Sequence, residues 1–266
     1  MDMTPAPAPR PTIVRNLAIG VLMLGVDPRR LAQLRFLPRY WRERRAFVAA
    51  GGKVTHHFPI LADYADQAGA AKGHYFHQDL LVASFIHASA PRRHVDVGSR
   101  VDGFVAHVAA FRPIEVMDVR ALDDTGHANI RFLKRDLMDR APDMDGMADS
   151  VSCLHAIEHF GLGRYADPVN PSGHMEGFRN IWRMVAPGGR LYMGFPIGRA
   201  NEVHFNAHRV FHPRDIFTWA NDLGPENLER FDYVDDAGKL HCNVDLLAGD
   251  IAVVYGCGIY TFRRPG

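Results

Sequence analysis

Short runs of β-forming residues alternate with helical or turn segments from His94 to the end of the chain, and this alternation restricts the fold most strongly. The expected strands cover residues 94–97, 114–119, 130–133, 150–154, 190–195, 230–234 and 251–262. Strands that alternate with helices are typical of an α/β domain with a mainly parallel sheet. The last run is long, which favours an added antiparallel strand.

The residues before about position 70 differ in composition and predict an extension to the α/β domain. Residues 1–12 are rich in Pro and Ala, which is typical of a disordered tail. Residues 13–69 predict a helical extension with seven arginines against one acid between Arg29 and Arg45. Residues 70–266 are expected to form the α/β domain.

Charge and cysteine content argue against several classes of protein. The chain has 31 Lys and Arg against 30 Asp and Glu, so its net charge gives no reason to expect nucleic acid as a partner. Its cysteines, Cys153, Cys242 and Cys257, lack C-x-x-C spacing, so they indicate neither a cysteine zinc site nor a disulfide scaffold.

The apolar run at residues 16–26 is too short to cross a bilayer, which takes about 20 residues. A cytoplasmic location is therefore expected. Because the run is followed by arginines, we also expect residues 13–50 to make peripheral contact with an anionic membrane surface. The sequence carries no signal for an oligomeric state.

The first expected strand leads into DVGSRVDGF (96–104), where a glycine turn precedes a helical segment. Such a turn presents backbone N–H groups to an anionic ligand at the carboxyl end of a strand. A dinucleotide fingerprint that begins at Gly98 would require glycine at Arg100, so NAD and FAD are disfavoured. Asp118 ends the second strand at the spacing from which an acid reaches a ribose, and Asp136 follows the third strand.

The segment HAIEH (155–159) matches the zinc-peptidase signature H-x-x-E-H. That motif requires both histidines on one face of a helix. Here an apolar strand precedes the motif and a segment rich in Gly and Pro follows it, so we expect a strand end and a turn, and no metal site. A zinc hydrolase is kept as an alternative. Its further candidate ligands are His174, Glu176, His204 and His208.

Between about residues 74 and 262 these motifs resemble those of the class I, Rossmann-like S-adenosylmethionine-dependent methyltransferases. HVDVGSRVDGF resembles the first motif of that family, ADSVSCLHAIEHF its fourth strand, and VAPGGRLYMGFP the turn before its fifth strand. YFHQDL, HAIEHFGLGRYADP, FNAHRVF and YGCGIYTF resemble more narrowly a methyltransferase-like subfamily of unknown function found in bacteria and nematodes. The resemblance implies a seven-stranded, mostly parallel sheet with an antiparallel last strand, and S-adenosylmethionine as cofactor.

The resemblance and the residue chemistry together suggest three groups of site residues. The residues expected to bind the cofactor are Asp96, Gly98, Ser99, Gly103, Phe104, Asp118, Asp136 and Leu154. The candidates for a catalytic role are His155, Glu158, His159 and His208. The residues assigned to the acceptor are Arg164, Tyr165, Asn206 and Arg209.

The expected function is methyl transfer from S-adenosylmethionine to an oxygen or nitrogen atom of a small-molecule or glycan-like acceptor. A histidine would accept the proton, because neutral imidazole titrates near working pH. An alternative is a catalytically inactive binding or scaffold protein. Its motivation is the glycine turn, which has fewer glycines than is usual in the family.

Overall fold

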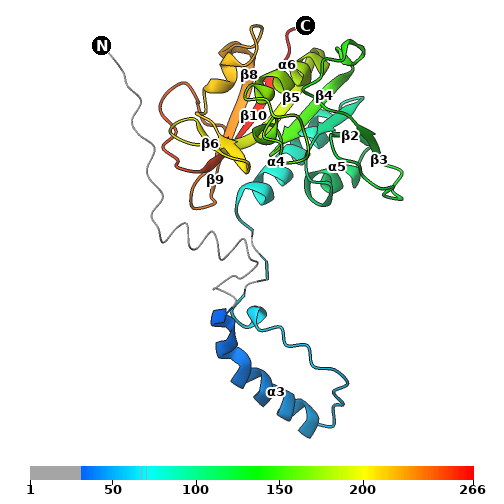
Figure 1. The fold of residues 1–266 in the computed structure, drawn as a ribbon, viewed down its shortest axis with the longest axis vertical. Coiled ribbons are helices and arrows are strands. Elements are labelled where there is room, and N and C mark those ends of the chain that lie inside the picture. Colours follow the sequence, from blue (N-terminus) through cyan, green and yellow to red (C-terminus); the bar gives the residue numbers. More distant parts are fainter. Residues whose placement is uncertain (1–30, 67, 70) are drawn as a thin grey trace. The chain divides into compact units, whose positions relative to one another are not determined.

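The computed structural model describes residues 31–66, 68–69 and 71–266 (Figure 1). The expected tail and the apolar run at residues 16–26 lie outside the described residues. The chain divides into two compact units, Met1–Ala70 and Ala71–Gly266. No helix in the described part of the chain is long and apolar enough to cross a membrane.

The described part of the first unit contains the short helices η1 (Ala32–Phe36) and η2 (Ala62–Ala65) and the longer helix α3 (Leu37–Ala49). Pro38 lies in the first turn of α3, where the missing N–H costs no hydrogen bond. Arg39 and Tyr64 both hydrogen-bond to Glu43. None of the residues in η1, α3 and η2 is buried, so the described helices of this unit have no apolar core of their own.

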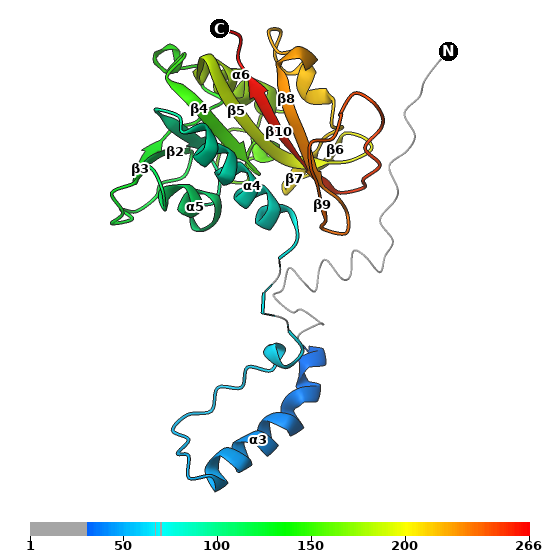
Figure 2. The ribbon, with the colours of Figure 1, turned by 180° about the vertical axis from the view of Figure 1, so that it is seen from behind.

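The second unit is built on one sheet with the strand order β3-β2-β1-β4-β5-β10-β8-β9. Strands β1 to β5 run parallel, whereas β10 is antiparallel to both of its neighbours (Figures 1 and 2). The expected mostly parallel sheet with an antiparallel last strand is therefore confirmed, with short β9 as one strand more than expected. The strands are β1 (His94–Val97), β2 (Ile114–Asp118), β3 (Ile130–Lys134), β4 (Ala148–Leu154), β5 (Val185–Ile197), β8 (Leu228–Val234), β9 (Leu240–His241) and β10 (Gly256–Arg263).

Helices cover both faces of this sheet. The apolar cluster on one face includes side chains of α4 (His74–Ser89), η3 (Val101–Val105) and α5 (Ala106–Ala109). The cluster on the other face includes side chains of α6 (Gly173–Met184) and η6 (Asp215–Thr218). The remaining elements are η4 (Pro142–Met144), η5 (Ile157–His159), η7 (Pro225–Asn227) and the hairpin of β6 (Glu202–His204) and β7 (His208–Val210).

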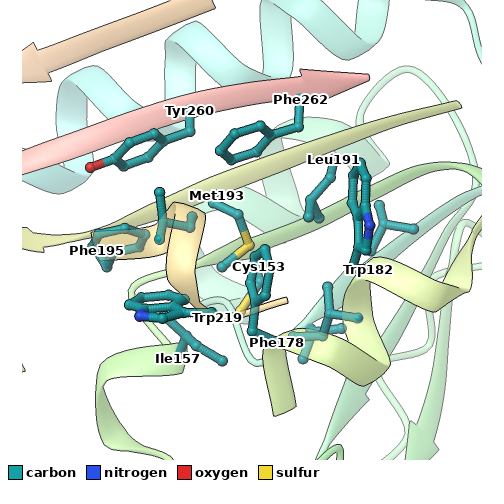
Figure 3. Close-up of a cluster of buried hydrophobic side chains, with 14 of the residues drawn as sticks. Cys153, Ile157, Phe178, Trp182, Leu191, Met193, Phe195, Trp219, Tyr260 and Phe262 are labelled. Atoms are coloured by element: carbon teal, nitrogen blue, oxygen red, sulfur yellow. The ribbon is translucent and has the colours of Figure 1, made fainter. Parts of the chain in front are cut away.

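Strand β5 shows how the sequence fills both apolar layers. Leu191, Met193 and Phe195 pack toward α6 and η6, as Figure 3 shows. Tyr192 belongs to the opposite cluster and stacks on Phe85 of α4. Because successive side chains of a strand point to opposite faces, a strand buried on both sides must be apolar throughout.

The strand order places the candidate site. From β1 the sheet continues through β2 to β3 in one direction and through β4 to β5 in the other. In open α/β sheets, ligands bind outside the carboxyl ends of the strands where the order reverses. The loops after β1 and β4 therefore border the expected binding crevice.

Candidate active site

The turn after β1 depends on Gly98. Its φ is +70°, in the left-handed region that favours glycine. A Cβ at this position would lie 2.8 Å from the Cβ of Ala156, which is closer than real Cβ contacts. The turn can therefore approach the loop after β4, and approach a ligand, because this residue has no side chain.

Asp96 stabilises this turn through hydrogen bonds of its carboxylate. Its carboxylate accepts hydrogen bonds from the Ser99 hydroxyl at 2.7 Å, from the Ser99 N–H at 3.1 Å and from the Ser152 hydroxyl at 2.5 Å. Burial raises the pKa of Asp96 to about 6, against the opposing effect of these serine hydrogen bonds. Asp96 was expected to bind cofactor directly, but it is fully buried, and its contacts indicate a positioning role.

An inner cavity of about 510 Å³ lies at the carboxyl ends of β1, β2 and β4. Asp118 and Asp136 line it together with Gly98, as the sequence led us to expect. The Asp118 carboxylate accepts hydrogen bonds from Nε and Nη2 of Arg120 at 2.9 and 2.6 Å. Asp136 accepts one from the Met138 N–H at 2.9 Å, and burial raises its pKa.

An outer cavity of about 1150 Å³ adjoins the inner one. The residues that line both cavities are Gly98, Arg120, His155, His159 and Tyr165. The residues that line only the outer cavity are His74, Tyr75, Arg100, Glu158, Arg164, His208 and Tyr255. The two cavities therefore form one continuous site with an acidic inner part and an outer part rich in His, Arg and Tyr.

The HAIEH segment is a strand end and a turn, as predicted. Strand β4 ends at Leu154, His155 has a φ of +50°, and only the short η5 follows. Without a helix, His155 and His159 do not take the i and i+4 positions that the zinc-peptidase motif requires. This geometry argues against the zinc hydrolase alternative.

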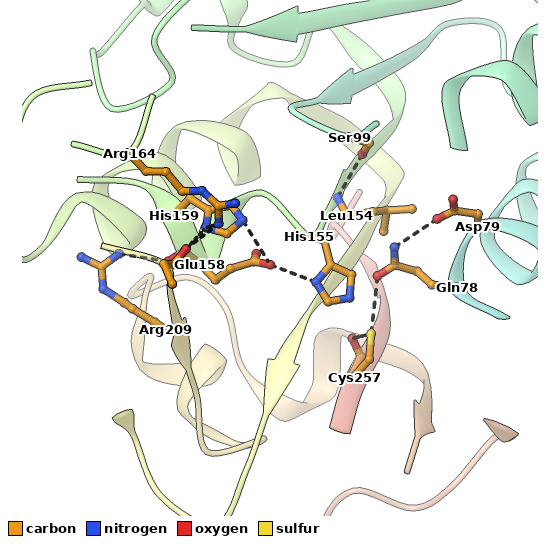
Figure 4. Close-up of polar contacts among 12 residues, drawn as sticks. Gln78, Asp79, Ser99, Leu154, His155, Glu158, His159, Arg164, Arg209 and Cys257 are labelled. Carbon is orange, nitrogen blue, oxygen red and sulfur yellow. Dashed lines mark hydrogen bonds and ion pairs between the residues drawn. The ribbon is translucent and has the colours of Figure 1, made fainter. Parts of the chain in front are cut away.

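His155 and Glu158 form a buried pair (Figure 4). His155 Nδ1 lies 2.9 Å from Glu158 Oε1. Burial alone would lower the pKa of His155, but the neighbouring Cys257 sulfur and the Glu158 carboxylate raise it well above its ordinary value. Burial would likewise raise the pKa of Glu158, but the histidines beside it lower it.

His159 has a different environment. Its Nδ1 lies 2.7 Å from the carbonyl oxygen of Ala207, so Nδ1 carries the proton and donates it. Its Nε2 lies 3.8 Å from Glu158 Oε1 and is free to act as a base. Burial lowers the pKa of His159, and the cation of Arg164 adds to this effect, so the ring is neutral at pH 7.

His208 also lines the outer cavity, and its Nε2 has no hydrogen-bond partner in the described part of the chain. Burial lowers its pKa. Arg164 and Tyr165, which the sequence assigns to the acceptor, also line the outer cavity. Arg164 donates to the same Ala207 carbonyl that holds His159, at 2.7 Å.

Arg209 and Asn206 do not line the cavities in which an acceptor substrate would bind. Arg209 is buried and donates to the carbonyl oxygens of Phe160 at 2.6 Å and Pro171 at 3.3 Å, so it holds a loop together. Asn206 is exposed and lines neither cavity. Neither residue lies with Arg164 and Tyr165 in the lining of the outer cavity.

The remaining expected cofactor residues lie behind the cavities. Phe104 and Leu154 are buried in the apolar cluster below α4. Ser99 bonds to Asp96 and accepts a hydrogen bond from the Leu154 N–H at 3.2 Å. A Cβ on Gly103 would lie 2.9 Å from a carboxylate oxygen of Asp79, so this glycine allows close packing of η3 on α4.

Several residues of the site were not assigned to it from the sequence. They are His74, Arg100, Arg120, Tyr255 and Cys257. His74 lies directly before the segment YFHQDL, and Cys257 lies within YGCGIYTF. The resemblance of these segments to the narrower subfamily was the one indication in the sequence that both residues belong to the site. Burial lowers the pKa of His74 to about 4.

Residues 126–217 match a family described as "Caenorhabditis protein of unknown function, DUF268". This match covers less than half of the chain and includes the loops after β4 and β5. It agrees with the expected resemblance to a subfamily of unknown function. A comparison with curated proteins finds no match.

Solved structures share the fold at low sequence identity. The [4+2]-cyclase SpnF is 15% identical, with a TM-score of 0.51 over 81% of this chain and 90% of SpnF. The 1,6-didemethyltoxoflavin-N1-methyltransferase of Burkholderia thailandensis, solved with its named substrate and S-adenosylhomocysteine, is 12% identical, with a TM-score of 0.49 over 99% of this chain and 94% of that one. The N-methyltransferase NodS of Bradyrhizobium japonicum is 18% identical, with a TM-score of 0.44 over 71% of this chain and 94% of NodS. The expected Rossmann-like fold of class I methyltransferases is confirmed.

Proposed function

We propose that this protein transfers a methyl group from S-adenosylmethionine to an oxygen or nitrogen atom of a small polar molecule. The observation that carries the proposal is the continuous pair of cavities at the carboxyl ends of β1, β2 and β4. One is suited to a nucleoside and the other to a polar acceptor. Neighbours of the same fold that were solved with S-adenosylhomocysteine support the choice of cofactor.

The residues of the inner cavity fit the cofactor. Asp118 would hold the ribose hydroxyls, because a carboxylate has about four lone-pair sites and Arg120 does not use them all. Asp136 would accept from the adenine amino group.

Arg100 stands where the family usually has a further glycine, but it leaves the inner cavity open. Its guanidinium pairs with Asp102 at 2.7 Å and lies 5.4 Å from the ring centre of Tyr75. Arg100 therefore lines only the outer cavity. This placement supports a working cofactor site despite the low glycine content of the turn.

When bound, S-adenosylmethionine supplies a methyl group on a positively charged sulfur, ready for in-line displacement. The protein then has to orient the acceptor and accept its proton. We assign the proton to Nε2 of His159, since its Nδ1 is already committed to Ala207. Loss of such a base reduces the rate by roughly 10²–10⁴-fold.

The lining of the outer cavity favours an acceptor with an acidic group, including an acidic glycan-like molecule. Arg100, Arg120 and Arg164 place guanidinium groups around it. Guanidinium groups bind carboxylate and phosphate through paired hydrogen bonds. The centre of the Tyr165 ring lies 4.3 Å from the Arg120 guanidinium carbon, and this ring offers a flat surface on which a ring of the acceptor can stack.

Calorimetric titration of the purified protein with S-adenosylmethionine tests the proposal. We expect micromolar binding that weakens at least tenfold in Asp118→Asn. Asp124→Asn changes an exposed acid outside both cavities and should leave the affinity unchanged. A folded wild-type protein that does not bind the cofactor would refute the proposal.

A second candidate is a protein that binds the cofactor without methyl transfer. It is favoured by the similarity to SpnF, which is named a cyclase, because one fold can host unrelated reactions. Formation of S-adenosylhomocysteine with an acidic small molecule would establish methyl transfer. Cofactor binding without this product on any acceptor would favour the second candidate.

A further inference from the structure

Three potential metal ligands meet at the wall of the outer cavity. A ring nitrogen of His74, a ring nitrogen of His155 and Sγ of Cys257 all lie within 4.8 Å of one another. They come from the start of α4, the end of β4 and β10. Both histidines line the outer cavity, whereas Cys257 is fully buried behind them.

An unpaired nitrogen independently indicates a missing ligand. The side chain of His155 is only 5% exposed, and its Nε2 has no hydrogen-bond partner among the described residues. Leaving a buried polar atom unpaired costs about 1–3 kcal/mol. Because Glu158 holds Nδ1, Nε2 is the nitrogen available to a ligand. Figure 4 shows His155 between Glu158 and Cys257.

Each histidine also has the outer partner that metal ligands require. Histidines that bind a metal almost always donate their other N–H to a carboxylate or a backbone carbonyl, which fixes the ring. Glu158 lies 2.9 Å from His155 Nδ1. His74 hydrogen-bonds to the backbone of Tyr255.

We propose that His74, His155 and Cys257 bind a zinc ion whose fourth position opens to the outer cavity. One thiolate and two imidazoles suit zinc, and three protein ligands with one open position are typical of catalytic zinc. Binding releases the Cys257 thiol proton to solvent. The double charge of the ion then balances the Cys257 thiolate and the Glu158 carboxylate, which are both buried.

The cluster needs only a small adjustment to hold the ion. Tetrahedral zinc with its usual bond lengths places ligand atoms about 3.3–3.6 Å apart. The atoms that are farthest apart therefore have to approach by up to about 1.2–1.5 Å from their present limit of 4.8 Å. Side-chain rotation of His74, which is half-buried, can supply this movement.

This site differs from the zinc-peptidase interpretation of HAIEH. Only His155 is shared, because His159 Nδ1 is bonded to Ala207 and Glu158 acts behind His155. The open position would take the acceptor's oxygen or nitrogen atom and lower its pKa. That use of the ion rests on the proposed methyl transfer, whereas binding of the ion does not.

Titration of the metal-free full chain with Co²⁺ tests the proposal without any activity assay. Thiolate ligation of Co²⁺ gives a near-ultraviolet charge-transfer band. We expect this band to saturate at one ion per chain and to disappear when Zn²⁺ is added. Cys257→Ser should abolish the band, and His74→Gln should weaken binding at least tenfold.

Glu158→Gln keeps the three ligands but weakens the hold on His155, so we expect roughly 10–100-fold weaker binding. Two control variants leave the three ligands unchanged. Cys242→Ser removes an exposed thiol, and His77→Gln removes a half-buried histidine of α4, the helix that carries His74. Both variants should bind Co²⁺ as the wild type does. Circular dichroism identifies the variants that fold, and only those are compared. If Cys257→Ser does not fold, His74→Gln and Glu158→Gln decide.

A wild-type protein without the charge-transfer band, or a band that persists in folded Cys257→Ser, would overturn the proposal. Cofactor affinity measured on the same samples separates the two proposals. Cobalt binding without S-adenosylmethionine binding would uphold the metal site and refute the proposed function. The reverse result would refute the metal site alone.

Discussion

Gly98 is the residue whose missing side chain matters most to the candidate site. Gly98→Ala would place a Cβ 2.8 Å from Ala156 and hold a φ of +70°. We expect it to lose about 1–3 kcal/mol of stability and at least tenfold in affinity for S-adenosylmethionine. Thermal unfolding and calorimetry measure the two effects.

Gly188→Ala is the matched control for this change. Gly188 has a similar φ of +74°, but a Cβ there would meet nothing within 4 Å. Gly188→Ala should lose only the stability that a side chain at positive φ costs, and it should bind the cofactor as the wild type does. Equal cofactor affinity in both variants would show that the turn at Gly98 does not hold the cofactor.

Asp96 should make the stability of the fold depend on pH. Its pKa is about 6 in the folded protein and near 3.8 when unfolded, so the folded state binds its proton more tightly. The contribution of Asp96 to stability is therefore full below about pH 4 and is lost as the pH rises through about 6. Asp96→Asn removes this dependence, because the amide does not titrate.

We expect the stability of Asp96→Asn, relative to the wild type, to rise by about 1–2 kcal/mol between about pH 5 and about pH 7.5. Urea unfolding at both pH values measures this difference, with the exposed Asp124→Asn as control. A constant difference would mean that Asp96 is ionised across the whole range.

The sequence showed which acids lie near the site but not which way each one points. Asp118 ends β2 and Asp136 follows β3, so both reach the carboxyl edge of the sheet and line the inner cavity. Asp96 lies within β1, where every residue is buried. Its three-residue distance to Ser99 allows a turn contact, but its bond to Ser152 needed the pairing of β1 with β4.

At the scale of elements, strand length decided what the sequence could reveal. Strand β1 was predicted with its observed bounds, because its short β-like run, with Val95 and Val97, is bounded by Arg93 and Gly98. The strands β6, β7 and β9 were missed, since a run of two or three residues is too short to carry a periodic signal. The cluster at Cys257 was hidden for another reason. Its three ligands meet only because β10 inserts beside β5.

Arg209 links β7 to the loop that follows β4, and its replacement tests that link. Arg209→Lys keeps the charge but loses the forked geometry that reaches the carbonyls of Phe160 and Pro171. We expect a loss of about 1–3 kcal/mol and faster amide hydrogen exchange over residues 158–171.

Arg140→Lys is the control, because Arg140 pairs with Asp145 at the surface and should change stability by less than about 0.5 kcal/mol. Unchanged exchange in Arg209→Lys would show that the buried guanidinium does not hold this loop in place.

At the scale of the whole molecule, the site residues and the extension lie in different units. Every residue that lines the inner and outer cavities belongs to the unit Ala71–Gly266. The sequence predicts a domain boundary near residue 70, because a basic segment precedes it and helices and apolar strands follow it. Cofactor binding and surface attachment can therefore be tested separately.

The extension is predicted to attach the protein to anionic membranes. In the first unit, Trp41 and Phe47 of α3 are 44% and 56% exposed, and Arg42 and Arg45 lie on the same helix. Basic residues near an anionic surface each contribute about 1 kcal/mol to membrane binding. Apolar rings that insert into the interface strengthen the binding further. We expect co-sedimentation with phosphatidylserine vesicles that decreases as salt is added, and none with phosphatidylcholine vesicles.

Deleting residues 1–50 should abolish this co-sedimentation, and Trp41→Ala with Phe47→Ala should weaken it several-fold. Neither change should affect the affinity for S-adenosylmethionine, because the cavities contain no residue of the first unit. Co-sedimentation that persists after the deletion would assign attachment to the second unit. A deletion that weakened cofactor binding instead would show that the extension contributes to the site.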